Sequence, residues 1–126
     1  MNKNAEAWVA ALLSDEYEQG RLVLHRKATP TAPDEWCCLG VACDLYLKAG
    51  GELDVIEHDD GHVSYNSASC RLPDVVRTWL GLRRAVGSMS RRAALGELND
   101  SGFTFAEIAA IIAAEPEGLF EAPLVE

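Results

Sequence analysis

Basic residues gather in two segments of a chain that is acidic as a whole. The 126-residue sequence has a formal net charge of −9 at pH 7, yet residues 77–92 contain five arginines and no acidic residue. A second basic segment, residues 21–27, contains Arg21, His25, Arg26 and Lys27. Such runs are usually solvated faces, but the planar donor fork of arginine also fits a phosphate group. The sequence therefore offers two places where a small phosphorylated ligand could bind.

An anion site is also expected where the least polar stretch of the chain begins. Apolar residues at helical spacing predict a central buried helix over about residues 35–49, with Asp34 as its N-cap and two glycines after its end. Free N–H groups at a helix N-terminus favour phosphate, and Trp36 could stack on a base there. Against this, the two acidic residues before Trp36 would repel a phosphate, and a core position is the commoner role of a tryptophan.

Polar residues elsewhere complete the expected ligand site. Asn99 and Asp100 lie between two expected helices, where they could bind ribose hydroxyls or hold the loop through hydrogen bonds to the backbone. We expect a nucleotide derivative to bind where Arg21, the loop of residues 30–35 and the start of the central helix meet. The residues expected to contact it are Gln19, Arg21, Trp36, Cys37, Asn99, Asp100 and Arg91. The alternative position for the same ligand is over Arg83, Arg84, Arg91 and Arg92.

Other chemistries find little support in the sequence. It contains no glycine-rich phosphate loop of Walker type and no acid–base pair that stands out, so no catalytic residue and no cofactor is expected. A Cys–His nucleophilic pair is left open. The histidines lack metal-ligand spacing, and a calcium loop beginning at Glu97 would place Ile108 where a carboxylate is needed. The four cysteines form no Cys-x-x-Cys pair, so we expect no metal and four reduced, buried thiols.

Charge and hydropathy also restrict the expected partners and location. The net charge of −9 argues against DNA or RNA binding driven by phosphate neutralisation. No apolar run approaches the roughly 20 residues of a membrane span, and no apolar signal core follows Met1. We therefore expect a cytoplasmic protein with no membrane partner, whose state of oligomerisation is left open.

The expected fold class is α+β, mainly α, in a single domain of residues 1–126 with an acidic C-terminal tail from about residue 115. A central helix, about four further helices and one β-hairpin make up this prediction. The further helices are expected over residues 4–14, from Pro73 to Gly81, from a Ser90 cap to Leu98, and over residues 105–114 after a Thr104–Glu107 capping box. The hairpin is expected near residues 53–65, around Asp-Asp-Gly. The core residues are expected to be Leu39, Cys43, Leu45, Trp79, Leu95 and Ile108.

Four motifs in order give the sequence a family resemblance. Residues 36–45 read Trp-Cys-Cys-Leu-Gly-Val-Ala-Cys-Asp-Leu, and further motifs lie at residues 17–20, 72–82 and 98–109. Together they resemble a family of small, mostly uncharacterised proteins of bacteriophages and actinobacteria, over about residues 8–112. Some small phage proteins of this kind resemble sponges, of the sequestin or lockin type, that sequester nucleotide signals of bacterial immunity. By analogy, the resemblance implies an anti-defence role in the host cytoplasm.

Two functions from different classes follow. The first is a non-enzymatic protein that binds and sequesters a nucleotide-derived immune signal, such as an ADP-ribose derivative or a cyclic nucleotide. The second is an acidic protein-interaction module that binds and inhibits a host protein. A small hydrolase of nucleotide signals ranks third, because no acid–base pair supports it.

Overall fold

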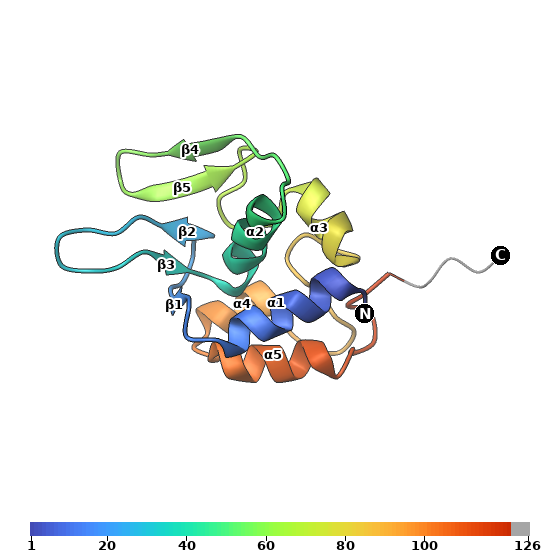
Figure 1. Ribbon diagram of the computed structural model, residues 1–126. Coiled ribbons are helices and arrows are strands. Elements are labelled where there is room, and N and C mark those ends of the chain that lie inside the picture. Colours follow the sequence, from blue (N-terminus) through green and yellow to red (C-terminus); the bar gives the residue numbers. More distant parts are fainter. Residues whose placement is uncertain (122–126) are drawn as a thin grey trace.

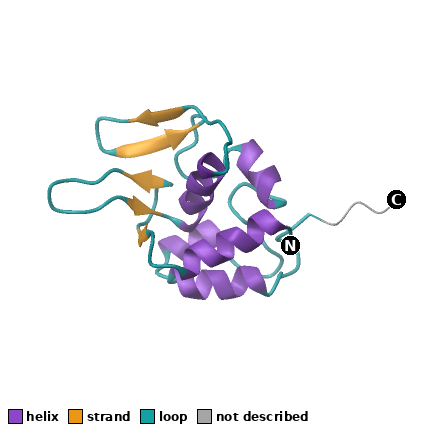
Figure 2. Cartoon of the chain, in the orientation of Figure 1, coloured by secondary structure: helices purple, strands orange, loops and turns teal. Residues whose placement is uncertain are grey.

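The computed structural model describes residues 1–121, which form five helices and one five-stranded sheet. The helices are α1 (Lys3–Leu13), α2 (Cys38–Lys48), α3 (Asp74–Leu80), α4 (Leu95–Asp100) and α5 (Phe105–Ala113). Figure 1 places α2 at the centre, with the strands on one side and α1, α4 and α5 beneath it. In this view helices and strands occupy different parts of the molecule (Figure 2).

The sheet is mixed and is built from very short strands. They are β1 (Glu18–Gln19), β2 (His25–Arg26), β3 (Glu35–Trp36), β4 (Val55–Glu57) and β5 (His62–Tyr65). Their order is β1-β3-β2-β5-β4, with β1 and β3 parallel and the other neighbours antiparallel. The predicted mainly α domain with one hairpin is therefore wrong. The hairpin β4–β5 exists, but it is extended by three strands of two residues each, which are too short to show the alternation that identifies a strand.

The predicted start of the central helix is also wrong, because Glu35 and Trp36 belong to β3. The helix begins at Cys38, and its N-cap is Cys37, whose Sγ accepts a hydrogen bond from the N–H of Gly40. Asp34 is used elsewhere, as an acceptor for His25 and for the N–H of Ala28. Pairing of residues 35–36 with two neighbouring strands thus outcompetes an additional helical turn.

Among the caps and ends predicted for α3, α4 and α5, some are confirmed and others are wrong. The capping box is confirmed: Thr104 Oγ1 accepts from the N–H of Glu107, and Glu107 Oε1 accepts from the N–H of Thr104. Gly81 ends α3 in the left-handed conformation, with φ of 77°. The Ser90 cap is wrong, since α4 begins only at Leu95, and Asn99 and Asp100 form its last turn rather than a break. The predicted packing of Leu124 and Val125 lies outside the described residues.

One hydrophobic core joins all five helices to the sheet. Leu39, Cys43, Leu95 and Ile108 are completely buried in it, as predicted, whereas Leu45 and Trp79 are half-buried at its edge. Trp8 of α1 is also completely buried, and its indole N–H donates to the carbonyl of Cys38, 2.8 Å away. The first and second helices are therefore fixed to each other by both packing and a hydrogen bond.

The four cysteines differ in accessibility. All four are free thiols, but the prediction that all four are buried is wrong, because Cys70 is exposed while the other three are buried. Burial raises the pKa of Cys37 to about 11 and raises the pKa values of Cys38 and Cys43 further above their usual range. The three buried thiols therefore remain protonated and shielded at neutral pH.

We expect a thiol reagent such as DTNB to modify one cysteine of the native protein quickly and all four after denaturation without reductant. Cys70→Ser should remove the fast phase and leave three slow thiols, because the nucleophile is an accessible thiolate. A time course of absorbance in buffer and in guanidinium measures both counts. Two or more fast thiols in the folded protein, or fewer than four after unfolding, would contradict this assignment.

Two further properties concern only the part of the chain that is described. None of the helices within residues 1–121 combines the length and apolarity needed to cross a membrane. Within the same residues, no group of three or more His, Cys, Asp or Glu side chains is placed to hold a metal ion.

Candidate functional site

Two amide side chains, the buried Asn99 and the half-buried Gln19, tie the end of β1 to the starts of α2 and α5. Asn99 is completely buried; its Oδ1 accepts from the N–H of Cys38 at 3.1 Å and from Gln19 Nε2 at 2.9 Å, while its Nδ2 donates to the carbonyl of Gly20 at 2.8 Å. Gln19 Nε2 also donates to the carbonyl of Phe103, and its Oε1 accepts from the N–H of Phe105. We call this arrangement the amide junction. Both side chains are occupied by the protein itself, so they position the neighbouring elements.

The N–H groups at the N-terminus of α2 are less available to a ligand than the sequence predicted. The N–H of Cys38 bonds Asn99, and the N–H of Gly40 bonds the sulfur of Cys37. Two of the N–H groups that were expected to be free for phosphate oxygens therefore already have acceptors. A ligand near this terminus would have to be recognised mainly by neighbouring side chains.

A cavity of about 230 Å³ opens beside the junction. Its apolar lining includes Leu22, Leu39 and Val86, its two thiols are Cys37 and Cys70, and its carboxylates are Glu97 and Asp100. The volume is below the roughly 300–1,000 Å³ of pockets that enclose a drug-sized ligand. The cavity can therefore hold one moiety of a larger molecule, such as a base or a ribose.

Leu22 lies at this cavity in an unusual conformation. Its φ is 73°, in the left-handed region that residues other than glycine, asparagine and aspartate rarely adopt, and 71% of its surface is exposed. Its N–H donates to Asp100 Oδ1 at 2.8 Å, which holds the turn to the end of α4. Strained backbone is common at binding sites, where the rest of the fold maintains it.

Arg21 lies on the other side of the same turn. It lines a neighbouring hollow of about 210 Å³ together with Gln19, Gly102, Phe103 and Thr104, at the start of α5. Its guanidinium lies over Gly102, since a Cβ placed on this glycine would be 3.3 Å from Arg21 Nη2. Within residues 1–121, no carboxylate forms an ion pair with Arg21. Arg21 is exposed, so its charge faces solvent at this hollow.

Trp36 is close to the junction but is largely covered by other aromatic rings. Its carbonyl accepts from the N–H of Gly20, and its ring stacks on His25 with centroids 3.6 Å apart and planes 12° apart. Tyr17 meets it edge-on, with centroids 5.6 Å apart. Stacking on His25 occupies one face of the indole, so only its other face is left for the predicted contact with a base.

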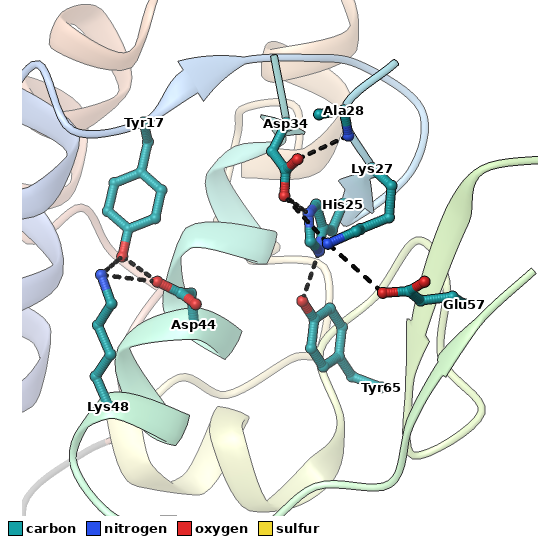
Figure 3. Close-up of polar contacts among 9 residues, drawn as sticks. All are labelled: Tyr17, His25, Lys27, Ala28, Asp34, Asp44, Lys48, Glu57 and Tyr65. Atoms are coloured by element: carbon teal, nitrogen blue, oxygen red, sulfur yellow. Dashed lines mark hydrogen bonds and ion pairs between the residues drawn. The ribbon is translucent and has the colours of Figure 1, made fainter. Parts of the chain in front are cut away.

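His25 connects a carboxylate to a buried phenol (Figure 3). Its Nε2 lies 2.8 Å from Asp34 Oδ2 and its Nδ1 lies 2.8 Å from Tyr65 Oη. A carboxylate only accepts hydrogen bonds, so Nε2 donates to Asp34. Burial of Asp34 alone would raise its pKa, but the hydrogen bonds from His25 and Ala28 and the charge of Lys27 outweigh burial and lower the pKa below its ordinary value. The ionised form of Asp34 therefore stabilises the fold.

We expect Asp34→Asn to destabilise the protein at pH 7 and to have a smaller effect in acid. Because the folded-state pKa is below the unfolded one, the stabilisation is complete above the unfolded value of about 3.9 and is lost as the pH falls through the folded-state pKa. Urea titrations of parent and variant at pH 7, 5, 4 and 3 measure the difference. Asp59→Asn, an exposed acid in the hairpin turn, serves as the control. If the difference in free energy of unfolding between the parent and Asp34→Asn stays constant down to pH 3, the stabilising role of the ionised Asp34 is contradicted.

A second polar group fastens the N-terminal segment to α2, and neither of its contacts was predicted from the sequence. Tyr17 Oη donates to Asp44 Oδ2, and Lys48 Nζ lies 3.1 Å from the same carboxylate (Figure 3). Burial, followed by the hydrogen bond to Asp44, raises the pKa of Tyr17 to about 12. This phenol is therefore neutral at physiological pH and holds the segment before β1 in place. Tyr17 and Asp44 both belong to the sequence motifs, and their pairing explains why a tyrosine and an aspartate suit these positions.

The arginine-rich segment is divided among different roles. Arg77 pairs with Asp74 and Glu121, whereas Arg83 and Arg84 line a hollow of about 230 Å³ with Ser88, Ser90 and Gly118. Arg91 is exposed and lines neither this hollow nor the two hollows beside the amide junction. The fold therefore brings Gln19, Arg21, Cys37, Asn99 and Asp100 together, places Trp36 next to them, and leaves Arg91 apart.

These features define a small α+β domain in which two amide side chains fix three chain segments beside a surface cavity. The chain belongs to the family described as a domain of unknown function, DUF8296, which matches residues 1–116. No curated protein and no solved structure matches the chain.

Proposed function

We propose that the protein binds and sequesters a small phosphorylated nucleotide derivative without converting it. The observation that supports this best is the cavity beside the amide junction, whose lining includes the carboxylates of Glu97 and Asp100, together with the separate hollow lined by Arg21, which forms no ion pair within residues 1–121. The biological setting that fits is the host cytoplasm during phage infection, where an ADP-ribose derivative or a cyclic nucleotide carries an immune signal. Sequestration would then counter that defence.

The residues suggest how such a ligand would lie. The apolar lining around Leu39 and Val86 suits the flat face of a base, since ligand sites combine a mostly apolar surface with a few placed polar groups. Asp100 Oδ1 already accepts from Leu22, and its second oxygen remains for a ribose hydroxyl. Carboxylates bind ribose hydroxyls in this way in dinucleotide-binding folds. The phosphate would extend out of the cavity towards Arg21, away from Glu97 and Asp100.

Native mass spectrometry of protein purified from cells gives the first test, because a tight sponge retains its ligand. Calorimetry with ADP-ribose and with cyclic dinucleotides follows. Arg21→Gln and Asp100→Asn should each weaken binding by about tenfold, as expected for one hydrogen bond to a charged group. Asn at position 100 keeps an acceptor for the N–H of Leu22, so the turn should persist. Lys3→Gln and Asp59→Asn are the matched controls, since they remove the same charges from exposed positions elsewhere.

The outcomes separate the alternatives. If Arg21→Gln and Asp100→Asn bind the nucleotide like the parent and Arg84→Gln does not bind it, binding in the cavity beside the amide junction is refuted. The nucleotide would then bind in the hollow lined by Arg83 and Arg84. Chromatography of the ligand after long incubation with protein distinguishes sequestration from hydrolysis. If no nucleotide binds and purified protein carries none, sequestration is refuted.

The sheet edge supports the second function, a module that binds a host protein. Within the described residues β4 has a neighbour on one side only, and Val55 and Ile56 are 45% and 43% exposed. An exposed edge strand can pair with an extended segment of another protein. Ile56→Arg would then abolish binding of a host partner and leave nucleotide binding unchanged.

A further inference from the structure

The loop between α3 and α4 is held in a fixed shape by the C-terminal segment. The N–H of Arg83 donates to the carbonyl of Leu119 at 3.0 Å, and the N–H of Ser90 donates to the carbonyl of Glu117 at 2.8 Å. Within the loop, the N–H of Gly87 donates to the carbonyl of Arg84 at 3.1 Å. These bonds prevent the loop from spreading over the surface, so its side chains are presented in a defined arrangement.

Gly118 allows the C-terminal segment to lie close to the loop at the edge of a hollow. Its φ is 87°, and a Cβ at this position would lie 2.7 Å from Ser90 Oγ and 2.9 Å from Ser90 N. Only glycine therefore allows the two segments to approach so closely. This hollow has a volume of about 230 Å³ and is lined by Arg83, Arg84, Ser88, Met89, Ser90 and Gly118.

The polar groups of this hollow are mostly donors. Arg83 uses its Nε to bond the carbonyl of Phe120 at 2.9 Å, which orients the guanidinium, and its terminal nitrogens bond no acceptor among residues 1–121. Within residues 1–121, neither Arg83 nor Arg84 forms an ion pair with a carboxylate. Glu121 is engaged by Arg77, and Glu117, next to Gly118, is the nearby acid in the sequence that would oppose an anion.

We propose that the hollow is a binding site for a phosphate group, in the form of a free phosphate or a phosphomonoester. Two guanidinium forks and two hydroxyls supply more donors than a carboxylate's two oxygens can use, and they match the several terminal oxygens of a phosphate. The site is formed by residues other than those beside the amide junction. It therefore does not depend on the proposed nucleotide binding, and each can be tested separately.

The test is a titration of the ¹⁵N-labelled protein with inorganic phosphate at constant ionic strength, followed by amide chemical shifts at pH 7. Saturable shifts should appear at residues 83–90 and 118. Arg84→Gln should weaken binding by about tenfold, and Ser88→Ala should weaken it less. Arg92→Gln is the matched control, because Arg92 is exposed in the same segment and does not line the hollow. It should leave the affinity nearly unchanged.

Two results would overturn the proposal. One is the absence of saturable shifts at these amides. The other is equal weakening by Arg84→Gln and Arg92→Gln, which would indicate general attraction to a basic surface. Glucose 6-phosphate, added in the same buffer, distinguishes a phosphomonoester site from one that admits only the free ion, and either result supports the phosphate site. Asp100→Asn should leave the phosphate titration unchanged, so a failure of nucleotide binding does not affect this outcome.

Discussion

Gly40→Ala should destabilise the protein by about 3 kcal/mol or more, the upper part of the range for overpacked cores. Gly40 lies in the first turn of α2, and a Cβ there would be 1.7 Å from the carbonyl oxygen of Leu24 and 2.6 Å from its carbonyl carbon. Leu24 cannot move away easily, because its N–H donates to Ser69 and its carbonyl accepts from Cys37. The helix and the segment before β2 would have to separate.

Gly96→Ala provides the matched comparison. Gly96 also lies in a helix, but a Cβ there would meet Leu39 Cδ1 at 3.5 Å and the carbonyl of Val86 at 3.7 Å, which are ordinary contacts. This variant should be neutral or should gain up to about 1 kcal/mol from the better helix propensity of alanine. Chemical denaturation of both variants measures the contrast. Equal stabilities would show that α2 does not pack against Leu24 as described.

Asn99→Ala should cost about 3 kcal/mol or more, because it leaves several buried polar groups without partners, each worth about 1–3 kcal/mol. The N–H of Cys38 and the carbonyl of Gly20 both lose the bonds that Asn99 provides, and Gln19 loses one of its acceptors. Asn99→Asp should be similarly harmful, since it would place a carboxylate oxygen against the carbonyl of Gly20 in a fully buried site.

The proper control is Asn4→Ala, because Asn4 makes a single partly buried bond to the carbonyl of Trp79. It should cost about 1 kcal/mol. A double-mutant cycle between Asn99→Ala and Gln19→Ala measures the coupling between the two amides, expected at about 1 kcal/mol or more. Additive effects would mean that the two side chains stabilise the fold independently.

Secondary structure could be predicted where a local signal was long enough. The apolar periodicity of α1 and α5, the capping box at Thr104 and the left-handed glycine after α3 act within one or two turns, and each appears in the fold. The strands β1, β2 and β3 contain two residues each. Their existence depends on pairing between distant segments, so no pattern within them could reveal the five-stranded sheet.

In the candidate site, too, the sequence predicted some of the residues but not the contacts between them. Sequence reasoning selected Gln19 and Asn99 as polar residues near expected turns. It did not show that the two side chains bond each other, because they lie 80 positions apart. It also named Asp34 as the cap of the central helix, whereas Cys37 has that role and Asp34 binds His25. In both cases a side chain with several available partners was placed by tertiary contacts, which the local sequence does not specify.

Gln19 and Asn99 of the amide junction are 80 positions apart in the sequence, which affects when the protein can complete folding during synthesis on the ribosome. The Gln19 side chain bonds Asn99, Phe103 and Phe105, and α1 packs against α5. Trp8 can pack against α2 as soon as this helix has left the exit tunnel, whereas the side-chain bonds of Gln19 can form only after the chain up to Phe105 has emerged. Folding must be completed after synthesis of α5, and nascent chains arrested before this point should remain sensitive to protease.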